Sequence, residues 1–375
     1  MPPDALAGAE RVLVVRPDNL GDVVLTAPLF RALHEHLPNA ELTLLASPGG
    51  ALAAPLVPFI DRVETVRAIW QDLGGRLPFD PGGELEFVAR LRGGNYDAAL
   101  ICTSFSQTPF APGYAAYLAG IPVRVGQAGD FGGSVLSHTV EPAADGSHQA
   151  ERNLHLLEAL GVPVRDRALR LRVPPDAQRG ADELLDGAGI GEAPIIVAPG
   201  ASCAARRYDP TRYGIAAREL AQRTGRDVVI VGAARERAMA DAVTDVCPSA
   251  VSFAGRTSFP ELAGVVARAG LVLCGNSATL HLADAFARPV VALYSGTDRE
   301  SEWGPRQAPA RLLRIETFCA PCRRFDCPYA MACLAIEPEL VVDAGLELLA
   351  ITTATTTTAT RTPAAEEDRW VASAS

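Results

Sequence analysis

Three short loops in this chain combine glycine with hydroxyl, carboxylate or guanidinium groups, which bind and react with phosphates and sugars. The first loop, Asn19-Leu20-Gly21-Asp22, follows the apolar segment 11–16. A glycine lets a loop backbone approach a ligand closely, and the Asp22 carboxylate can act as a general base. Asp22 can also cap the following helix, and spacing alone favours that simpler interpretation.

The second loop places a hydroxyl and two guanidinium groups after a β-branched segment. It runs Pro199-Gly200-Ala201-Ser202 and is followed by Arg206 and Arg207. Arginine forms paired, charge-assisted hydrogen bonds to phosphate oxygens, so this loop suits a diphosphate. A solvated basic turn is an equally good interpretation of the loop taken alone.

The third loop, Gly275-Asn276-Ser277-Ala278, is made of small residues and leads to His281. Its backbone amides, together with the positive end of the dipole of the helix that follows, suit an anion. The alternative roles are structural: Ser277 would be an N-cap, and His281 a hydrogen-bonded core histidine.

Four of the eight cysteines form a cluster near the C-terminus: Cys319, Cys322, Cys327 and Cys333. Four thiols at this spacing could hold a structural zinc ion. The alternative is a loop of free thiols that are buried or redox-sensitive, and in neither case do we expect a catalytic role. The other four cysteines lie in apolar stretches.

The three loops belong to an alternation of apolar β-branched runs and amphipathic segments, which predicts parallel βαβ units. We expect two doubly wound domains, residues 1–175 and 176–350, facing each other across a cleft that holds the ligands. Residues 351–375 are low in complexity, and we expect them to be disordered. Strands are predicted at 11–16, 41–47, 97–103, 121–126, 194–200, 226–232, 271–275 and 288–296. Helices are predicted at 23–37, between the third and fourth strands, and at 148–160, 176–186, 210–223, 235–246, 258–268, 279–287 and 339–350.

Composition excludes several classes of function. The 375 residues carry a net charge of −10, which disfavours a nucleic-acid groove. All 34 basic residues are arginine, so a Walker A loop, a lysine Schiff base and a Ser–Lys dyad are excluded. The glycines at 187–191 follow a predicted helix instead of a strand, which disfavours a nicotinamide dehydrogenase. With no signal peptide and no apolar run near the roughly 18 residues that span a bilayer, we expect a cytoplasmic protein.

Several segments, in the right order and spacing, resemble glycosyltransferase family 9, the bacterial heptosyltransferases. They include RVLVVRPDNLGDVVLTAPLF, PGASCAARRYDPTRY, LVLCGNSATLHLADAFARPVVALYSGTD and CAPCRRFDCPYAMACLAIEPE. The resemblance covers residues from about 11 to 350. It implies the GT-B fold of two Rossmann-like domains, with the acceptor on the first and the nucleotide sugar on the second. It also implies metal-independent, inverting transfer of heptose from ADP-heptose.

The resemblance assigns a role to each loop. Asp22 matches the family's catalytic base, with Asn19 and Gly21 on the acceptor side. Ser202 matches the hydroxyl residue near the donor phosphates, and Arg206 takes the place of a phosphate-binding lysine. Glu236 falls near the acidic residue that holds the ribose. The donor turn corresponds to Asn276-Ser277-Ala278, followed by His281.

Two residues of the donor turn depart from the family pattern. Asn276 stands where an aspartate is usual, and Ala278 where a glycine is usual. An amide offers a sugar hydroxyl a neutral partner, and an alanine at a position needing positive φ is strained.

We therefore predict an inverting glycosyltransferase that transfers heptose to a lipopolysaccharide-core-type acceptor. Its partners are a nucleotide sugar and a saccharide or lipid-linked saccharide, with peripheral membrane contact left open and a monomer expected. The alternatives are a glycosyltransferase of secondary metabolism that uses another nucleotide sugar, and a non-catalytic nucleotide-sugar-binding protein.

Overall fold

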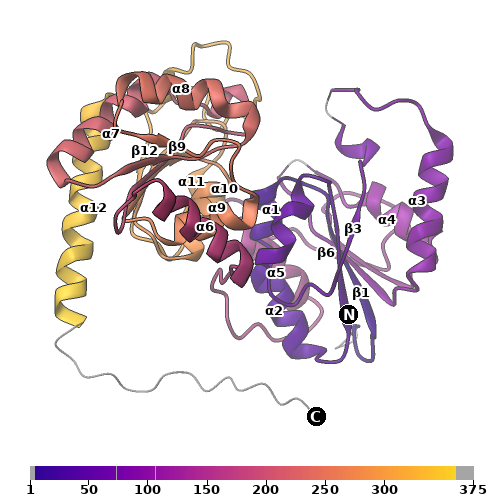
Figure 1. The fold of residues 1–375 in the computed structure, drawn as a ribbon. Coiled ribbons are helices and arrows are strands. Elements are labelled where there is room, and N and C mark those ends of the chain that lie inside the picture. Colours follow the sequence, from indigo (N-terminus) through magenta and orange to yellow (C-terminus); the bar gives the residue numbers. More distant parts are fainter. Residues whose placement is uncertain (1–4, 73, 106, 360–375) are drawn as a thin grey trace.

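A computed structural model describes residues 5–72, 74–105 and 107–359. For residues 352–359 it describes the helical backbone only. It contains two six-stranded parallel sheets, each covered by helices (Figure 1). The two doubly wound domains predicted from the sequence are confirmed. No helix of the described residues is long and apolar enough to cross a membrane.

The first sheet has the strand order β3-β2-β1-β4-β5-β6. Its central strands are built from Val, Leu, Ile and Ala and are almost fully buried, as expected for a parallel sheet covered on both faces. The strands are β1 (Arg11–Arg16), β2 (Glu41–Ala46), β3 (Arg62–Thr65), β4 (Ala98–Ile101), β5 (Val123–Gln127) and β6 (His138–Val140). The helices are α1 (Leu20–Val24), α2 (Ala27–His36), α3 (Pro81–Gly93), α4 (Phe110–Leu118) and α5 (Gln149–Glu158).

The second sheet has the order β12-β11-β10-β7-β8-β9, which repeats the topology of the first sheet. Its strands are β7 (Ile195–Ala198), β8 (Val228–Ile230), β9 (Val251–Ser252), β10 (Leu271–Gly275), β11 (Val290–Leu293) and β12 (Ala310–Leu313). Its helices are α6 (Pro175–Gly187), α7 (Pro210–Thr224), α8 (Arg237–Val246), α9 (Phe259–Ala267), α10 (Ala278–Ala285), α11 (Glu300–Trp303) and α12 (Pro338–Ala359).

The predicted elements are present, with local differences. The single helix expected at 23–37 is two helices, because the chain breaks at Leu25–Thr26 and the Thr26 hydroxyl donates to the Val23 carbonyl at 2.6 Å. Helix α12 continues to Ala359, past the point where we expected disorder to begin. The rest of that predicted tail, 360–375, lies outside the described residues.

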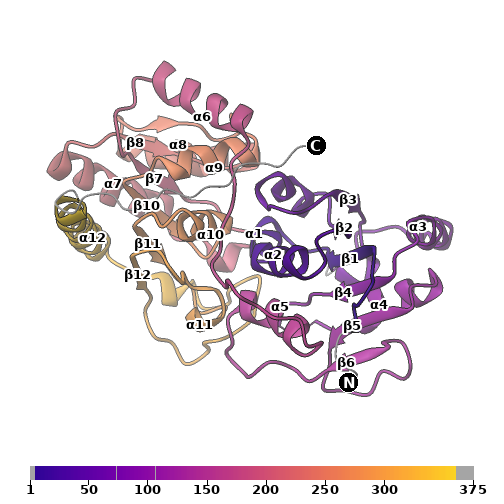
Figure 2. The same ribbon diagram turned by 90° about the horizontal axis from the view of Figure 1, so that it is seen from below.

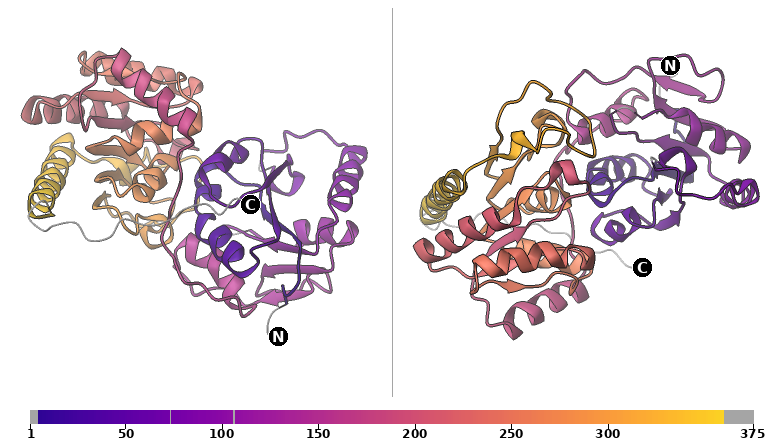
Figure 3. Two further views of the ribbon diagram at one scale, coloured as in Figure 1. Left: turned by 60° about the horizontal axis from the view of Figure 1, so that its bottom comes forward. Right: turned by 90° about the horizontal axis from the view of Figure 1, so that it is seen from above.

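The two domains lie side by side, and α1 of the first contacts α10 of the second at their junction (Figures 2 and 3). Helix α12 packs against α7 on the second domain, on the side away from the first (Figure 1). The junction is therefore formed by the loops and short helices that follow the central strands.

Candidate functional site

The three predicted loops all start from central strands where the strand order reverses. In the first sheet this place lies between β1 and β4, and in the second between β7 and β10. Ligands of open α/β sheets bind at the carboxyl ends of the strands at such switch points. The first loop follows β1, the second follows β7 and the third follows β10.

The first and third loops meet across the domain junction at Gly21. A Cβ atom placed on Gly21 would lie 2.8 Å from His281 Cδ2 and 3.6 Å from the Cα of Ala278, the first residue of α10. Only a glycine allows this approach without displacing the histidine ring. The structure thus places the residue beside Asp22 directly against the N-terminal turn of α10.

Asp22 lies in the first turn of α1 and is largely buried. Its Oδ2 accepts the backbone N–H of Asn19 at 3.1 Å. The N-cap residue is Asn19 and Asp22 is the third helical residue, so Asp22 bonds back to the start of its own helix and is not the N-cap of a following one. Its Oδ1 accepts a hydrogen bond from Arg16 Nη2 at 2.8 Å and one from the Ser104 hydroxyl at 3.3 Å. The carboxylate therefore caps the helix and also faces charged and polar groups at the end of the sheet.

Arg16, at the end of β1, is a site residue that the sequence prediction missed. Its side chain is fully buried between two carboxylates, with Nε 3.2 Å from Asp18 Oδ2 and Nη2 2.8 Å from Asp22. Burial raises the pKa of Asp18, against the effect of Arg16. Gln71 and Gln107 donate to the other oxygen of Asp18 at 3.2 and 2.7 Å. These contacts hold Asp22 in one orientation.

The second loop gathers its polar groups around Arg206. The Arg206 guanidinium donates from Nη1 to the Ser202 hydroxyl at 3.3 Å and from Nε to the Thr297 hydroxyl at 3.1 Å. Its Nη2 lies 2.6 Å from Asp298 Oδ2. The structure therefore brings the predicted pair Ser202 and Arg206 together, and it holds the guanidinium from three sides.

Glu236 lies beside this loop. Its Oε2 accepts the backbone N–H of Ala233 at 2.7 Å, and a Cβ on Gly200 would clash with its carboxylate. Glu236 therefore stands at the carboxyl ends of β7 and β8, adjacent to the glycine of the predicted phosphate loop. This position is compatible with the ribose-binding role that the resemblance implies, which stays a prediction.

In the third loop, Ser277 is the N-cap residue of α10, but its side chain does not make the capping bond. Its hydroxyl oxygen is buried and has no hydrogen-bond partner among the residues that the structure describes. Ala278 is helical, so the strain considered for this position does not arise. His281 is buried, and burial lowers its pKa. The buried Ser277 hydroxyl thus lies at the N-terminus of α10, where the anion-binding role predicted from the sequence stays a prediction.

Asn276 and Asp298 form a contact that the sequence did not indicate. Asn276 is buried, and its Nδ2 donates to Asp298 Oδ2 at 3.3 Å. Asp298 also accepts from Arg323, whose guanidinium lies 5.0 Å from the centre of the Phe105 ring in the first domain. Residues of both domains thus meet around this carboxylate.

A sequence model of glycosyltransferase family 9 (heptosyltransferase) matches residues 85–332. The chain belongs to this family.

Relatives of this family 9 chain include lipopolysaccharide heptosyltransferase 3 of Escherichia coli K12, which is 25% identical over 288 residues, 74% of this chain and 80% of that protein. Lipooligosaccharide heptosyltransferase 2 of Haemophilus influenzae is 25% identical over 356 residues, 90% of this chain and 99% of that protein.

Two solved structures share the fold. The family 9 glycosyltransferase of Veillonella parvula has a TM-score of 0.74 at 20% identity, covering 94% of this chain and 99% of its own. ADP-heptose lipopolysaccharide heptosyltransferase II of E. coli has a TM-score of 0.69 at 21% identity, covering 92% and 99%. The predicted family, GT-B fold and glycosyltransferase activity are therefore confirmed. The roles of single residues stay predictions.

The junction of this glycosyltransferase is also held by a turn after α11. Asp284, in α10, is buried, and its Oδ1 accepts three backbone N–H groups, those of Arg306, Gln307 and Ala308, at 2.8–2.9 Å. The same turn contacts the first domain: His148 Nε2 lies 3.0 Å from the Gly304 carbonyl, Gln307 donates to the Leu169 carbonyl at 2.9 Å, and Arg306 pairs with Glu151. One carboxylate thus ties α10 to a turn that touches both domains.

The zinc hypothesis for the cysteine cluster is not supported. Among the described residues, no group of three or more His, Cys, Asp or Glu side chains could hold a metal ion. The thiols instead accept local hydrogen bonds: Cys327 Sγ from the N–H groups of Tyr329 and Met331, and Cys333 Sγ from that of Gly296. All four cysteines are free, so the alternative of a loop of free thiols fits the structure better.

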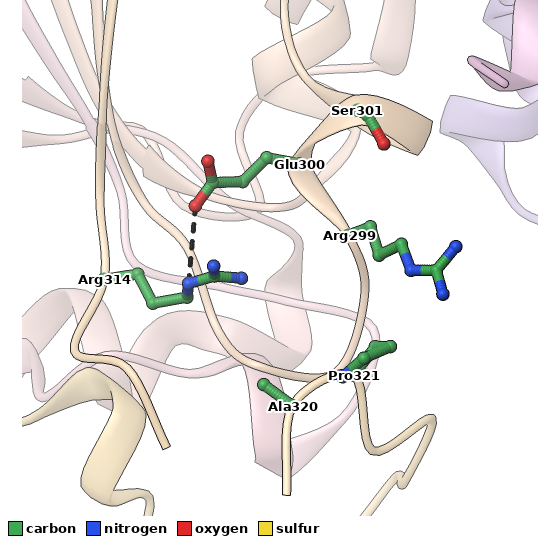
Figure 4. Close-up of a pocket in the computed structure, with 6 residues that line it drawn as sticks. All are labelled: Arg299, Glu300, Ser301, Arg314, Ala320 and Pro321. Atoms are coloured by element: carbon green, nitrogen blue, oxygen red, sulfur yellow. Dashed lines mark ion pairs between the residues drawn. The ribbon is translucent and has the colours of Figure 1, made fainter. Parts of the chain in front are cut away.

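A small hollow of about 220 Å³ lies beside α11, at the edge of the junction (Figure 4). Arg314 Nε and Glu300 Oε1, 3.5 Å apart, form an ion pair on one side of it, while Arg299 points away from this pair. Arg299 is 2.6 Å from Asp145 of the first domain. The arginines of this hollow therefore serve contacts within the protein.

Proposed function

We propose that this chain transfers heptose, with inversion, from ADP-heptose to a sugar hydroxyl of a lipopolysaccharide-core-type acceptor, and that Asp22 is the general base. The observation that carries the proposal is the contact of Gly21 with His281 and the first turn of α10. This contact places the largely buried Asp22 carboxylate next to the proposed anion site at the start of α10. The names of the relatives described above favour heptose and ADP-heptose.

The donor diphosphate would bind between the second and third loops. Arg206 supplies a guanidinium, while Ser202 and Ser277 supply hydroxyl groups, and that of Ser277 is unpaired within the described part of the chain. The N-terminus of α10 adds backbone N–H groups and its dipole. Glu236, beside Gly200, would accept hydrogen bonds from the ribose hydroxyls. These groups also stabilise the charge that develops on the departing diphosphate.

The reaction then needs one proton transfer and one displacement. Asp22 would accept the proton of the acceptor hydroxyl as its oxygen attacks the anomeric carbon. The bond from that carbon to the diphosphate oxygen breaks, and its electron pair leaves with ADP. Arg16 and Ser104 hold the Asp22 carboxylate in place throughout. The close packing of Gly21 against His281 would help to exclude water from the reacting groups.

Three further predictions remain part of this proposal. The acceptor domain would span residues 1–175 and the donor domain 176–350. The acceptor hydroxyl would belong to a saccharide or a lipid-linked saccharide. The protein would act as a monomer in the cytoplasm.

A panel of nucleotide sugars tests the proposal. Purified protein is incubated with ADP-, UDP- and GDP-sugars and a heptose-free core acceptor, and free nucleoside diphosphate is measured. ADP release from ADP-heptose that depends on both acceptor and Asp22 is the expected result. Release of UDP or GDP alone would favour the alternative, a glycosyltransferase that uses another nucleotide sugar. Asn276 supports that alternative, because its neutral amide replaces the aspartate that is usual in the family. Nucleotide binding without release from any donor would favour a non-catalytic protein.

A further inference from the structure

Asp298 is the most heavily bonded carboxylate at the junction. It follows β11 and is 4% exposed. Its Oδ2 accepts from Arg206 Nη2 at 2.6 Å, from the Thr297 hydroxyl at 2.7 Å and from Asn276 Nδ2 at 3.3 Å. Its Oδ1 accepts from Arg323 Nη1 at 3.0 Å. A carboxylate can accept about four such hydrogen bonds. All the acceptor positions of Asp298 are therefore taken by groups of the protein itself.

These bonds determine how Arg206 is presented. A guanidinium is a rigid planar fork, and its direction is set once two of its nitrogens are bound. In Arg206, Nε is bound by Thr297 and Nη2 by Asp298. The remaining bond, from Nη1 to Ser202, is the longest of the three at 3.3 Å. The side of Arg206 that faces Ser202 is therefore the side available to a phosphate.

The contact between Asn276 and Asp298 requires one of the two side chains to be neutral. The amide nitrogen of Asn276 donates to Asp298 at 3.3 Å, and both residues are buried. A carboxylate at position 276 would place two negative charges at this separation, where burial leaves little screening by water. It would also compete with Asp298 for the guanidinium of Arg206.

Arg323 holds the opposite side of Asp298. Its guanidinium binds Asp298 through Nη1 and the buried Glu302 through Nη2, at 3.0 and 2.5 Å. It also stacks on Phe105 of the first domain, one residue after Ser104, which contacts Asp22. The side chains that fix Asp298 thus reach from the second domain to the loop that orients the base.

We propose that Asp298 is a positioning residue that orients Arg206 for the donor diphosphate, and that Asn276 must stay neutral for it to do so. The inference rests on the proposed function, because it takes Arg206 to be the cation that binds the donor. Asp298 itself need not touch the donor.

Three variants test the inference: Asp298→Asn, Asn276→Asp and the double variant that exchanges the carboxylate and the amide. The affinity for ADP is measured by calorimetry, and kcat and donor KM by ADP release. Each single variant should bind ADP roughly 10- to 100-fold more weakly, the worth of one charge-assisted hydrogen bond. The double variant restores one carboxylate and one amide, so it should bind ADP within about threefold of wild type.

The matched control is Asp166→Asn. Asp166 also lies between two arginines, 2.8 Å from Arg31 and 3.0 Å from Arg170, but outside the three loops. This variant should leave ADP affinity and donor KM unchanged. If Asp298→Asn acted only by unfolding part of the protein, kcat would fall with the active fraction while KM stayed constant. Our inference requires donor KM to rise.

The outcomes separate this inference from the proposed function. If wild type binds ADP but Asp298→Asn binds it equally well, or if the losses in the two single variants simply add in the double variant, the positioning role is wrong and the proposed function stands. If wild type binds no nucleoside diphosphate, the proposed function fails and this inference fails with it. If Asp298→Asn does not fold, the test rests on Asn276→Asp, which keeps the side-chain volume. Weaker ADP binding by this variant supports the inference, and unchanged ADP binding overturns it.

Discussion

Replacing Asp22 by Asn separates the role of base from the role of helix cap. The Asp22 carboxylate accepts from three donors, of which Arg16 and Asn19 lie on different oxygens. An amide has one acceptor oxygen, so its NH₂ group must face one of these two donors. We expect a loss of about 1–2 kcal/mol in the free energy of unfolding, the worth of one cap or one unsatisfied buried contact. Arg16 keeps Asp18 as its partner.

The effect on turnover should be far larger than the effect on stability. A positioned base contributes about 10²–10⁴-fold to the rate, and an amide cannot accept the proton. ADP affinity should be retained, because Asp22 lies in the first domain, which we propose binds the acceptor. Turnover is measured by ADP release under saturating donor, and folding by thermal unfolding.

The control for this experiment is Asp80→Asn. Asp80 also begins a helix, because its Oδ1 accepts the backbone N–H of Gly83 at 3.0 Å in the first turn of α3, away from the junction. It should lose neither turnover nor ADP affinity. Turnover of the Asp22 variant within a few fold of wild type would show that Asp22 is only a cap, and our reasoning about the base would be refuted.

Three further predictions concern the same junction. Arg206→Ala should weaken ADP binding by about 1.5–3 kcal/mol and Arg207→Ala by less; the reverse order in calorimetry would show that the loop is misassigned. Gly21→Ala places a Cβ 2.8 Å from His281 Cδ2, so kcat/KM should fall by up to ~100-fold. Adding His281→Ala should restore part of this loss. A single Gly21→Ala variant with unchanged kcat/KM would contradict the close approach. Burial, with Arg306 and His281 nearby, lowers the pKa of His148 to about 3, so its contribution to stability is present above pH 6.5 and is lost as the pH falls towards 3. Between pH 7 and 5, wild type should lose about 2 kcal/mol more unfolding free energy than His148→Asn, and equal losses in denaturant titrations would argue against a buried neutral histidine.

Much of the fold could be predicted because its central strands are short runs of apolar residues between helices. The strand at 271–275 has the bounds that the sequence indicated. The missed strands, β3, β6, β9 and β12, are the short edge strands of the two sheets. For example, β3 is Arg-Val-Glu-Thr and largely exposed, so its place depends on pairing with β2. The length of a closing helix is equally hard to predict where a threonine-rich segment follows it.

The candidate site was only half predictable, for a different reason. The loops were visible because glycines and polar residues follow apolar strands. Arg16 and Asp298 were not. Although Arg16 has the nearby Asp18 and Asp22 as partners, its contact with Ser104 joins distant segments, as do the contacts of Asp298 with Arg206, Asn276 and Arg323. Arg16 and Ser104 are 88 residues apart, and Arg206 and Thr297 are 91 apart. Spacing along a chain carries no information about such pairs. One local signal was present, since Arg16 follows four apolar residues of a buried strand and must therefore find buried partners.

The three backbone bonds of Asp284 have a mechanical consequence. Helix α10 has only eight residues, about 12 Å in length, yet its first turn carries the proposed phosphate site and its last turn carries Asp284. Because the turn at 304–308 is bonded to that carboxylate, the helix and the turn should move together as one rigid unit. One end of this unit lies at the proposed leaving-group site, and the other end contacts the first domain. If the unit tilts when ADP leaves, the turn moves away from His148 and Leu169, so product release and domain opening would occur together.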